Sequence, residues 1–150
     1  MIIDLRDDIA SVAQEILRIA RYTLQEQGTH LPTAVLHTLD RMIPIVLPFE
    51  DDEQKAALTA HVKKQVALND AHAVTTITSA KIIDARTGDQ RQCLVVATAM
   101  QGGRPYVVLQ YFSKNEDTGI VDFGEVVEGE DAEMPGQMII IPEWEEEMCH

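Results

Sequence analysis

The first apolar pattern in the chain has the three- to four-residue spacing of an α-helix. Its positions are Leu5, Ile9, Val12, Ile16, Ala20 and Leu24. Asp4 is suited to cap the start of such a helix, and Gly28 is suited to end it in the left-handed conformation. The pattern therefore predicts one amphipathic helix over Ile3–Gln27.

Two short runs rich in β-formers come next, Thr33–Leu39 and Met42–Leu47. Only Asp40 and Arg41 separate them, and two polar residues between apolar runs predict a tight β-hairpin. Pro44 has no N–H to donate to a strand ladder, so the second run is expected at a sheet edge or at a bulge.

An acidic run, Glu50–Glu53, opens a second segment with helical character that extends to about Asn69. Acids in the first turn complement the positive end of a helix dipole. The apolar set of this segment is small, which is typical of a helix that lies on a sheet. That set is Ala57, Leu58, Ala60, Val62, Val66 and Ala67.

From Ala71 onward the apolar pattern takes the two-residue repeat of β-strands. Four strands are predicted, at Val74–Ile83, Gln92–Met100, Pro105–Phe112 and Ile120–Val127. Short connections containing glycine favour antiparallel neighbours. Cys93–Ala99 is continuously apolar or small, which indicates a central strand covered on both faces.

The order α-β-β-α-β-β-β-β predicts an α+β fold with two helices packed on one face of a mostly antiparallel sheet. Residues 1–128 are expected to form a single domain, and residues 129–150 an acidic C-terminal extension that is partly docked. Within the extension, Met138–Trp144 is apolar enough to bury several large side chains. It is expected to dock as an added strand or against a partner subunit.

The acidic residues are distributed unevenly along the chain. Residues 115–150 carry 12 Asp or Glu and no Lys or Arg, so they account for −12 of the net charge of −13. A field of one sign affects partner choice rather than fold. It argues against nucleic acid and anionic membrane as partners and favours a basic protein. The expected partner-binding residues are Glu125, Glu128, Glu130, Asp131, Glu133, Glu145, Glu146 and Glu147.

Composition otherwise describes one ordinary globular domain of 150 residues, 45% of them hydrophobic. The longest apolar stretches are far shorter than the ~20 residues that span a bilayer. Met1–Asp4 lacks the basic and apolar regions of a signal peptide. Two cysteines do not suggest a disulfide scaffold. A cytoplasmic location is expected.

Candidate catalytic chemistry is sparse. The histidines lack the spacing of a metal site, and we expect neither a metal nor a cofactor. His37 shares a strand face with Val35 and Leu39, so we expect it to be partly buried with a shifted pKa. Cys93 lies in an apolar run, which favours a core role over a nucleophilic one. The sequence context of Ser79 and Ser113 does not match that of hydrolase nucleophiles.

Several pieces of the chain resemble a group of small uncharacterised bacterial proteins. The resemblance rests on Leu31–Val35, on the hairpin after it, on Leu47–Phe49 before an acid-led helix, and on the strands that contain Ser79 and Gln92–Ala99. It covers roughly residues 25–100. It implies a helix, a hairpin, a second helix and a β-meander, and it implies no functional residue.

Two functions stay open from the sequence. The first is a non-catalytic protein-interaction or regulatory module that uses the acidic C-terminal surface. The alternative is a small enzyme whose pocket gathers His37, His72, Asp84 and Arg104 from separate strands. A homodimer is expected in either case, because an edge strand and narrow apolar helix faces leave surface to cover.

Overall fold

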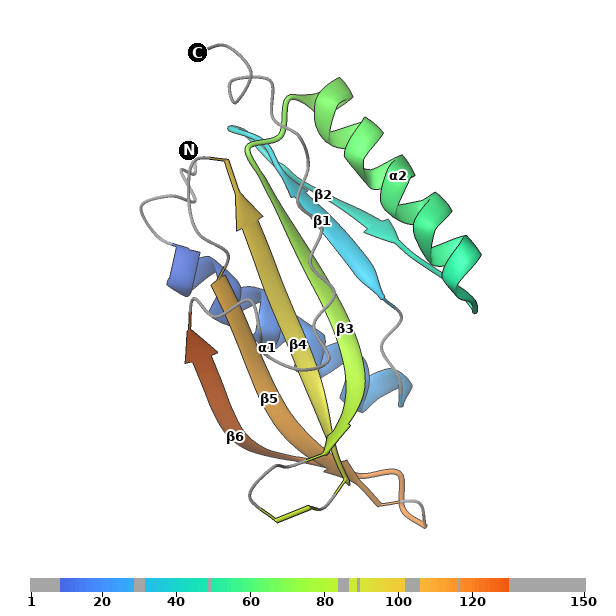
Figure 1. Cartoon of the computed structure of the whole chain (residues 1–150). Coiled ribbons are helices and arrows are strands. Elements are labelled where there is room, and N and C mark those ends of the chain that lie inside the picture. Colours follow the sequence, from blue (N-terminus) through green and yellow to red (C-terminus); the bar gives the residue numbers. More distant parts are fainter. Residues whose placement is uncertain are drawn as a thin grey trace.

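A computed structural model describes residues 9–28, 32–48, 50–83, 87–88, 90–101, 106–115 and 117–129 of the chain (Figure 1). The elements in order are α1 (Ile9–Gln27), β1 (Thr33–His37), β2 (Met42–Val46), α2 (Asp52–Asn69), β3 (Ala73–Ile83), β4 (Gln90–Met100), β5 (Tyr106–Lys114) and β6 (Val121–Gly129). This order confirms the predicted α+β class. The first residues of the predicted helix, 3–8, lie outside the described residues, as does the predicted extension 129–150 apart from Gly129, which is the last residue of β6.

The six strands form one antiparallel sheet in the order β2-β1-β3-β4-β5-β6. Strands β3 to β6 are sequential neighbours, as the predicted meander requires. The edges of the sheet are therefore β2 and β6 (Figure 1). The position of β2 confirms the edge strand predicted from Pro44.

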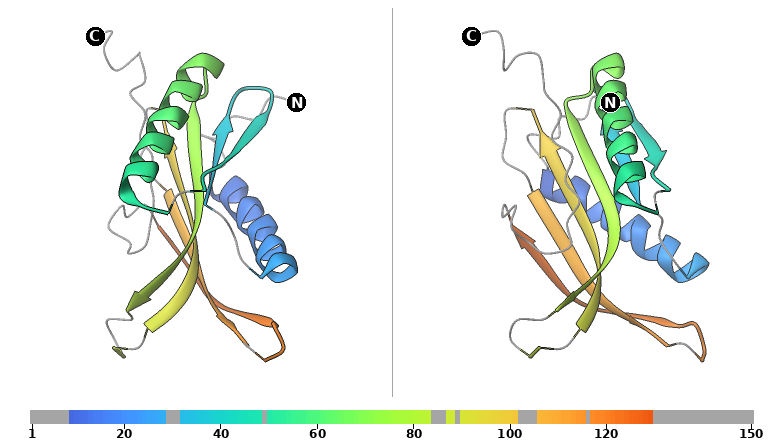
Figure 2. Two further views of the ribbon diagram at one scale, coloured as in Figure 1. Left: turned by 90° about the vertical axis from the view of Figure 1, so that its right-hand side faces the viewer. Right: turned by 45° about the vertical axis from the view of Figure 1, so that its right-hand side comes forward.

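The two helices lie on opposite faces of the sheet. Alternate residues of a strand point to opposite faces. Val35 and Val96 pack with α1, and we call their side the α1 face. Leu36 and Val74 pack with α2 on the other side, the α2 face. Figure 2 shows the sheet between the helices. The predicted placement of both helices on one face is wrong, because the inner strands are apolar on both sides and each side needs a cover.

Helix α1 is held by its apolar stripe. Its buried residues are Ala13, Ile16, Leu17, Ala20 and Leu24. Gly28 follows with φ of +76° and donates its N–H to Leu24 O at 2.8 Å. This is the left-handed stop that the sequence predicts. Helix α2 buries only Val62 and Val66 and packs on the sheet, as expected from its small apolar set.

The hairpin turn lies one residue earlier than predicted. Thr38 N donates to Arg41 O at 3.0 Å, so the two loop residues are Leu39 and Asp40. The Thr38 hydroxyl donates to the Asp40 carboxylate at 2.8 Å and accepts the Arg41 N–H at 3.2 Å. These local hydrogen bonds outweigh the strand preference of Leu39, which is 58% exposed.

A β-bulge distorts the other edge of the sheet. Phe112 pairs with Phe123 and Gln110 pairs with Val126, so two β6 residues oppose Tyr111. Gln110 connects this bulge to α1. Its amide nitrogen donates to Gly124 O at 3.0 Å, and its amide oxygen accepts from Arg21 Nη1 at 2.8 Å. A buried amide with both ends bonded fixes the position of β6 against the helix.

No helix within these described residues is both long and apolar enough to cross a bilayer.

Candidate functional site

The histidine expected to be buried belongs to a row of polar side chains across the sheet. His37 Nε2 and Thr75 Oγ1 share a hydrogen bond of 2.7 Å, and Thr75 Oγ1 and Thr98 Oγ1 share one of 2.8 Å. All three side chains are at most 3% exposed. The row joins β1, β3 and β4 under apolar cover. It satisfies buried polar groups and is closed to a substrate.

Burial, with a smaller contribution from the nearby charge of His72, lowers the pKa of His37 from 6.5 to about 4. His37 is therefore neutral at neutral pH. The expected burial and the expected pKa shift are both confirmed.

Two of the four residues of the predicted enzyme pocket, His37 and His72, belong to the described part of the chain. His72 N donates to His37 O at 2.9 Å, so the sheet brings these two residues together. Asp84 and Arg104 lie outside the described residues. Neither histidine lines the cavities described below. The side chain of His37 makes a structural contact with Thr75 and does not face a solvent-filled pocket.

Cys93 is a core residue, as its apolar run predicts. It is fully buried in the middle of the sheet. Burial raises the pKa of the Cys93 thiol from 9.0 to about 11, although the positive charge of Arg91 acts in the opposite direction. A thiol so rarely ionised is a poor nucleophile. Ser79 and Ser113 are exposed strand residues.

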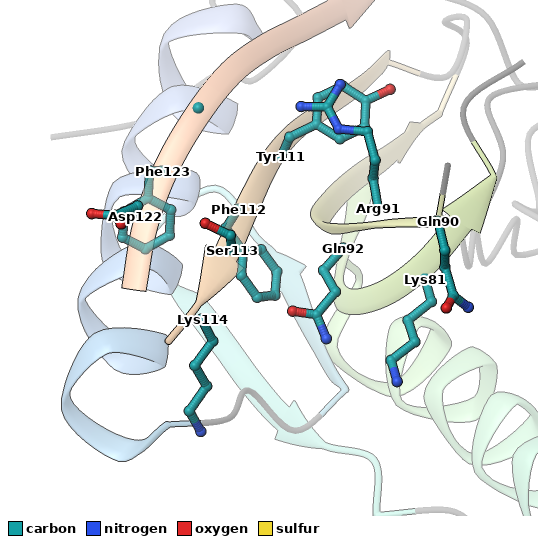
Figure 3. A pocket seen from close by; sticks show the side chains of 11 residues that line it. Lys81, Gln90, Arg91, Gln92, Tyr111, Phe112, Ser113, Lys114, Asp122 and Phe123 are labelled. Carbon is teal, nitrogen blue, oxygen red and sulfur yellow. The ribbon is translucent and has the colours of Figure 1, made fainter. Parts of the chain in front are cut away.

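A cavity of about 540 Å³ opens at the end of the sheet where β3 to β6 meet (Figure 3). Lys81, Arg91 and Lys114 line it. Arg91 lies over the Tyr111 ring at 3.6 Å from the centroid, and Lys114 Nζ donates to the backbone oxygen of the Gly28 residue at 3.0 Å. Figure 3 shows Lys81 and Lys114 pointing away from Arg91. The cations do not converge, so this hollow lacks the geometry of an anion-binding site.

A second cavity is an apolar groove between α1 and the β1–β2 hairpin, with a volume of about 490 Å³. We call it the α1–β2 groove. Its lining is uncharged and consists of Ile16, Ile19, Ala20, Thr23, Gln27, Thr33, Val35, Met42, Pro44, Val46 and Ile77. Ile19, Met42 and Val46 are 50%, 47% and 52% exposed. Large apolar side chains that lie together and are half exposed are more typical of a binding surface than of a hydrophobic core.

Sequence reasoning did not identify this groove. Met42, Pro44 and Val46 alternate with Ile43 and Ile45, so β2 is apolar on both faces although it lies at an edge. An edge strand with two apolar faces is the signal that could have indicated an uncovered surface.

The acidic residues expected to bind a partner lie mostly beyond the structure's described part. Glu125 is an exposed residue of β6, and Glu128 belongs to the same strand. Glu130, Asp131, Glu133 and Glu145–Glu147 are outside the described residues. Asp122 is a further exposed acid on β6, which has three acids and no base. Among the described residues, no three His, Cys, Asp or Glu side chains gather in a way that could hold a metal ion.

Comparison of the chain with models of protein families, with curated proteins and with solved structures finds no match. The resemblance to small bacterial proteins stays a prediction.

Proposed function

We propose that this chain is a non-catalytic protein-interaction module. It forms a homodimer through the α1–β2 groove, and its acidic C-terminal surface faces a basic protein partner. The observation that carries the proposal is the exposure of large apolar side chains along an uncharged groove of about 490 Å³.

The elements that form the groove expose further large side chains. Tyr22 on α1 is 66% exposed, and Leu39 at the hairpin tip is 58% exposed. Tyrosine and methionine are enriched in interface cores, and contiguous apolar surface on a folded domain is commonly an interaction site. A partner that fills the groove would remove Ile19, Met42 and Val46 from water.

The charge distribution favours a second copy as the occupant. Helix α1 carries Glu15, Glu26, Arg18 and Arg21, and the β1–β2 hairpin carries one acid and one base. Both elements are electrically neutral in a chain whose net charge is −13. Two copies therefore meet at this face without bringing like charges together, whereas a basic partner is attracted elsewhere. A two-fold dimer is also the commonest closed assembly.

Pro44 determines how two copies pack. Thr38 pairs with Arg41, and Leu47 N donates to Pro32 O at 2.7 Å, so hydrogen-bonded pairs alternate along the hairpin. Val35 and Pro44 then form a non-hydrogen-bonded pair, and the missing N–H of Pro44 lies on the outer edge of β2. This gap interrupts a continuous sheet between two β2 strands. The copies are expected to pack side chain against side chain.

The acids of β6 support the second part of the proposal. Asp122 and Glu125 are exposed on the edge strand farthest from β2. A homodimer that forms through the α1–β2 groove leaves this acidic edge free. Electrostatic attraction speeds encounters with a basic surface and weakens as salt shortens the Debye length from about 10 Å at 0.1 M to about 3 Å at 1 M.

Sedimentation equilibrium of the intact protein at micromolar concentration tests the dimer. A mass of two chains is expected, with little dependence on salt because the groove is uncharged. Met42→Glu should raise the dimer dissociation constant at least ~100-fold, since a two-fold contact loses each large buried side chain twice. Leu68→Glu is the matched control, because Leu68 is 68% exposed on α2, away from the groove.

A monomeric intact protein would contradict the homodimer. Equal weakening by Met42→Glu and Leu68→Glu would move the interface away from the groove. For the acidic surface, a basic partner whose association rate is indifferent to salt would contradict the electrostatic role.

A further inference from the structure

The α2 face carries a third apolar cluster, over strands β4 and β5. We call it the β4–β5 cluster. Its buried members are Cys93, Val95, Ala97, Val107 and Leu109, each at most 2% exposed. Tyr111 and Val127 pack against them. The cluster is as thoroughly buried as the parts of the sheet that lie under helices.

No element within the described residues covers this cluster. Helix α1 packs on the opposite face, against Leu94, Val96 and Val108. Helix α2 packs over β1 and β3 and reaches β4 only at Ala99. The face of a sheet is shielded from water only where a further layer lies on it. Because these side chains are buried within a single copy of the chain, the cover must come from another part of the same chain.

We propose that the apolar segment Met138–Trp144 of the same chain covers the β4–β5 cluster. The segment lies outside the described residues. Its large apolar side chains are Met138, Ile139, Ile140, Ile141 and Trp144. They match in kind the aliphatic surface that needs a cover, and burying several of them offsets the cost of ordering a short segment.

The connectivity favours this segment. Strand β6 ends at Gly129, which pairs with Val107, a member of the cluster. Residues 130–137 then form a polar connection of eight residues. Such a connection spans at most about 26–29 Å, whereas the step from β6 to β4 is two strand spacings of about 4.8 Å each. The apolar segment at residues 1–8 is less suited, because it leads directly into α1 on the other face.

Charge at the far end of the cluster agrees with this placement. Arg91 stacks over Tyr111, which packs against the cluster at the end away from Gly129. The segment is followed by three consecutive acids, Glu145–Glu147. A segment that runs from the Val107 end toward Tyr111 brings these acids close to a guanidinium group.

The reactivity of Cys93 toward a disulfide reagent tests the proposal in the full-length chain. Cys149→Ser first leaves Cys93 as the single thiol. Ile139→Asp and Ile140→Asp are then made separately, because neighbours in an extended segment point to opposite sides. At least one should speed the reaction of Cys93 at least ~10-fold, since a charge at a buried contact loosens the cover. Met148→Asp is the matched control and should leave the rate unchanged.

Other results of these experiments would overturn the proposed cover of the β4–β5 cluster. If neither isoleucine variant speeds the reaction while circular dichroism shows an intact sheet, the proposal is overturned. Protection that increases with protein concentration would assign the cover to a second copy and overturn it too. Cys93 should stay protected in Met42→Glu, whose dimer is weakened, so this inference can fail independently of the proposed function. If the isoleucine variants do not fold, acrylamide quenching of Trp144 in the intact chain decides, and full accessibility of Trp144 overturns the proposal.

Discussion

The two edge strands of the sheet, β2 and β6, differ in length, in charge and in the regularity of their pairing. Strand β2 is five residues long, apolar on both faces and interrupted by Pro44. Strand β6 is nine residues long, carries three acids and contains a bulge opposite Tyr111. Both edges would otherwise present rows of unpaired backbone groups to other chains. One edge is protected by a missing donor, and the other by charge and distortion.

The two edge strands therefore hinder different kinds of contact between copies of the chain. At β2 only backbone pairing is hindered, and the apolar side chains of Met42 and Val46 are left half exposed. At β6 the acids repel acidic chains as well, including further copies of this protein. The comparison teaches that β2 is suited to side-chain packing with a second copy, whereas β6 is suited to a partner of opposite charge.

Each edge also has a buried polar connection that joins it to the interior. His37, Thr75 and Thr98 form a hydrogen-bonded row beginning on β1, next to the β2 edge. Arg21, Gln110 and the backbone of Gly124 form the connection at the β6 edge. The first can gain a proton and the second cannot, so the two edges should respond differently to acid.

Acidification should destabilise the fold through His37, and this is the largest effect expected. The pKa of His37 is about 4 in the folded chain and 6.5 without the fold. As pH falls below 6.5, the unfolded chain binds a proton that the folded chain does not, so stability falls until both are protonated below about pH 4. The total loss is on the order of 3 kcal/mol.

Urea unfolding between about pH 7 and pH 4 measures this loss. His37→Gln should flatten the pH dependence, because the amide can still bond Thr75 but does not titrate. His61→Gln is the control, since His61 is exposed on α2. Equal pH profiles for His37→Gln and the parent protein would show that the row does not couple to protonation.

Loss of the Gln110 amide should destabilise the β6 edge, and the loss of free energy should be smaller than the loss expected from acidification. Gln110→Leu leaves the Gly124 carbonyl and the Arg21 guanidinium without their shared partner, which costs about 1–3 kcal/mol for buried groups. Because Arg21 is only half-buried and can be hydrated, the lower end is expected. Amide hydrogen exchange should quicken in β6 and not in the β1–β2 hairpin.

Gln92→Leu is a matched control on the neighbouring strand, because Gln92 lines the open cavity at the sheet end. It should change the free energy of unfolding by about 0.5 kcal/mol or less. Exchange that quickens equally in both hairpins would show that Gln110 acts on the whole sheet and not on its β6 edge.

The sequence predicts the order of elements because each has a clear local signal. The stripe of α1, the stop at Gly28 and the two-residue repeat of β3–β6 all depend on near neighbours in the chain. The face on which each helix lies depends on long-range packing. The apolar run Cys93–Ala99 indicates two covers but cannot tell which helix supplies which one, and the prediction of one shared face failed for this reason.

The candidate site was predicted less well, for a similar reason. The burial of His37 follows from its neighbours on one strand. The α1–β2 groove depends instead on how α1 packs beside the hairpin, which places Ile19 and Met42 along one groove, and no local pattern determines that packing. The bulge that allows Gln110 to bond Gly124 is likewise a property of strand pairing, although the isolated Gly124 within β6 is a signal that could have indicated it.

Pro44 offers the finest test of the comparison, with the smallest effect on the single chain. Pro44→Val restores an outward N–H at the β2 edge and costs about 0.4–1 kcal/mol through greater freedom of the unfolded chain. Because the dimer forms through side chains of the α1–β2 groove, the unbroken edge can add a second contact by backbone pairing with another β2 edge, so light scattering should show species larger than a dimer. Pro44→Lys restores the same N–H but also places a charge in the groove that Pro44 lines, so it should weaken the dimer as Met42→Glu does and should not form these species. If Pro44→Val stays dimeric at the same concentration, the missing donor is not what limits growth at this edge, and the apolar groove alone determines how copies meet.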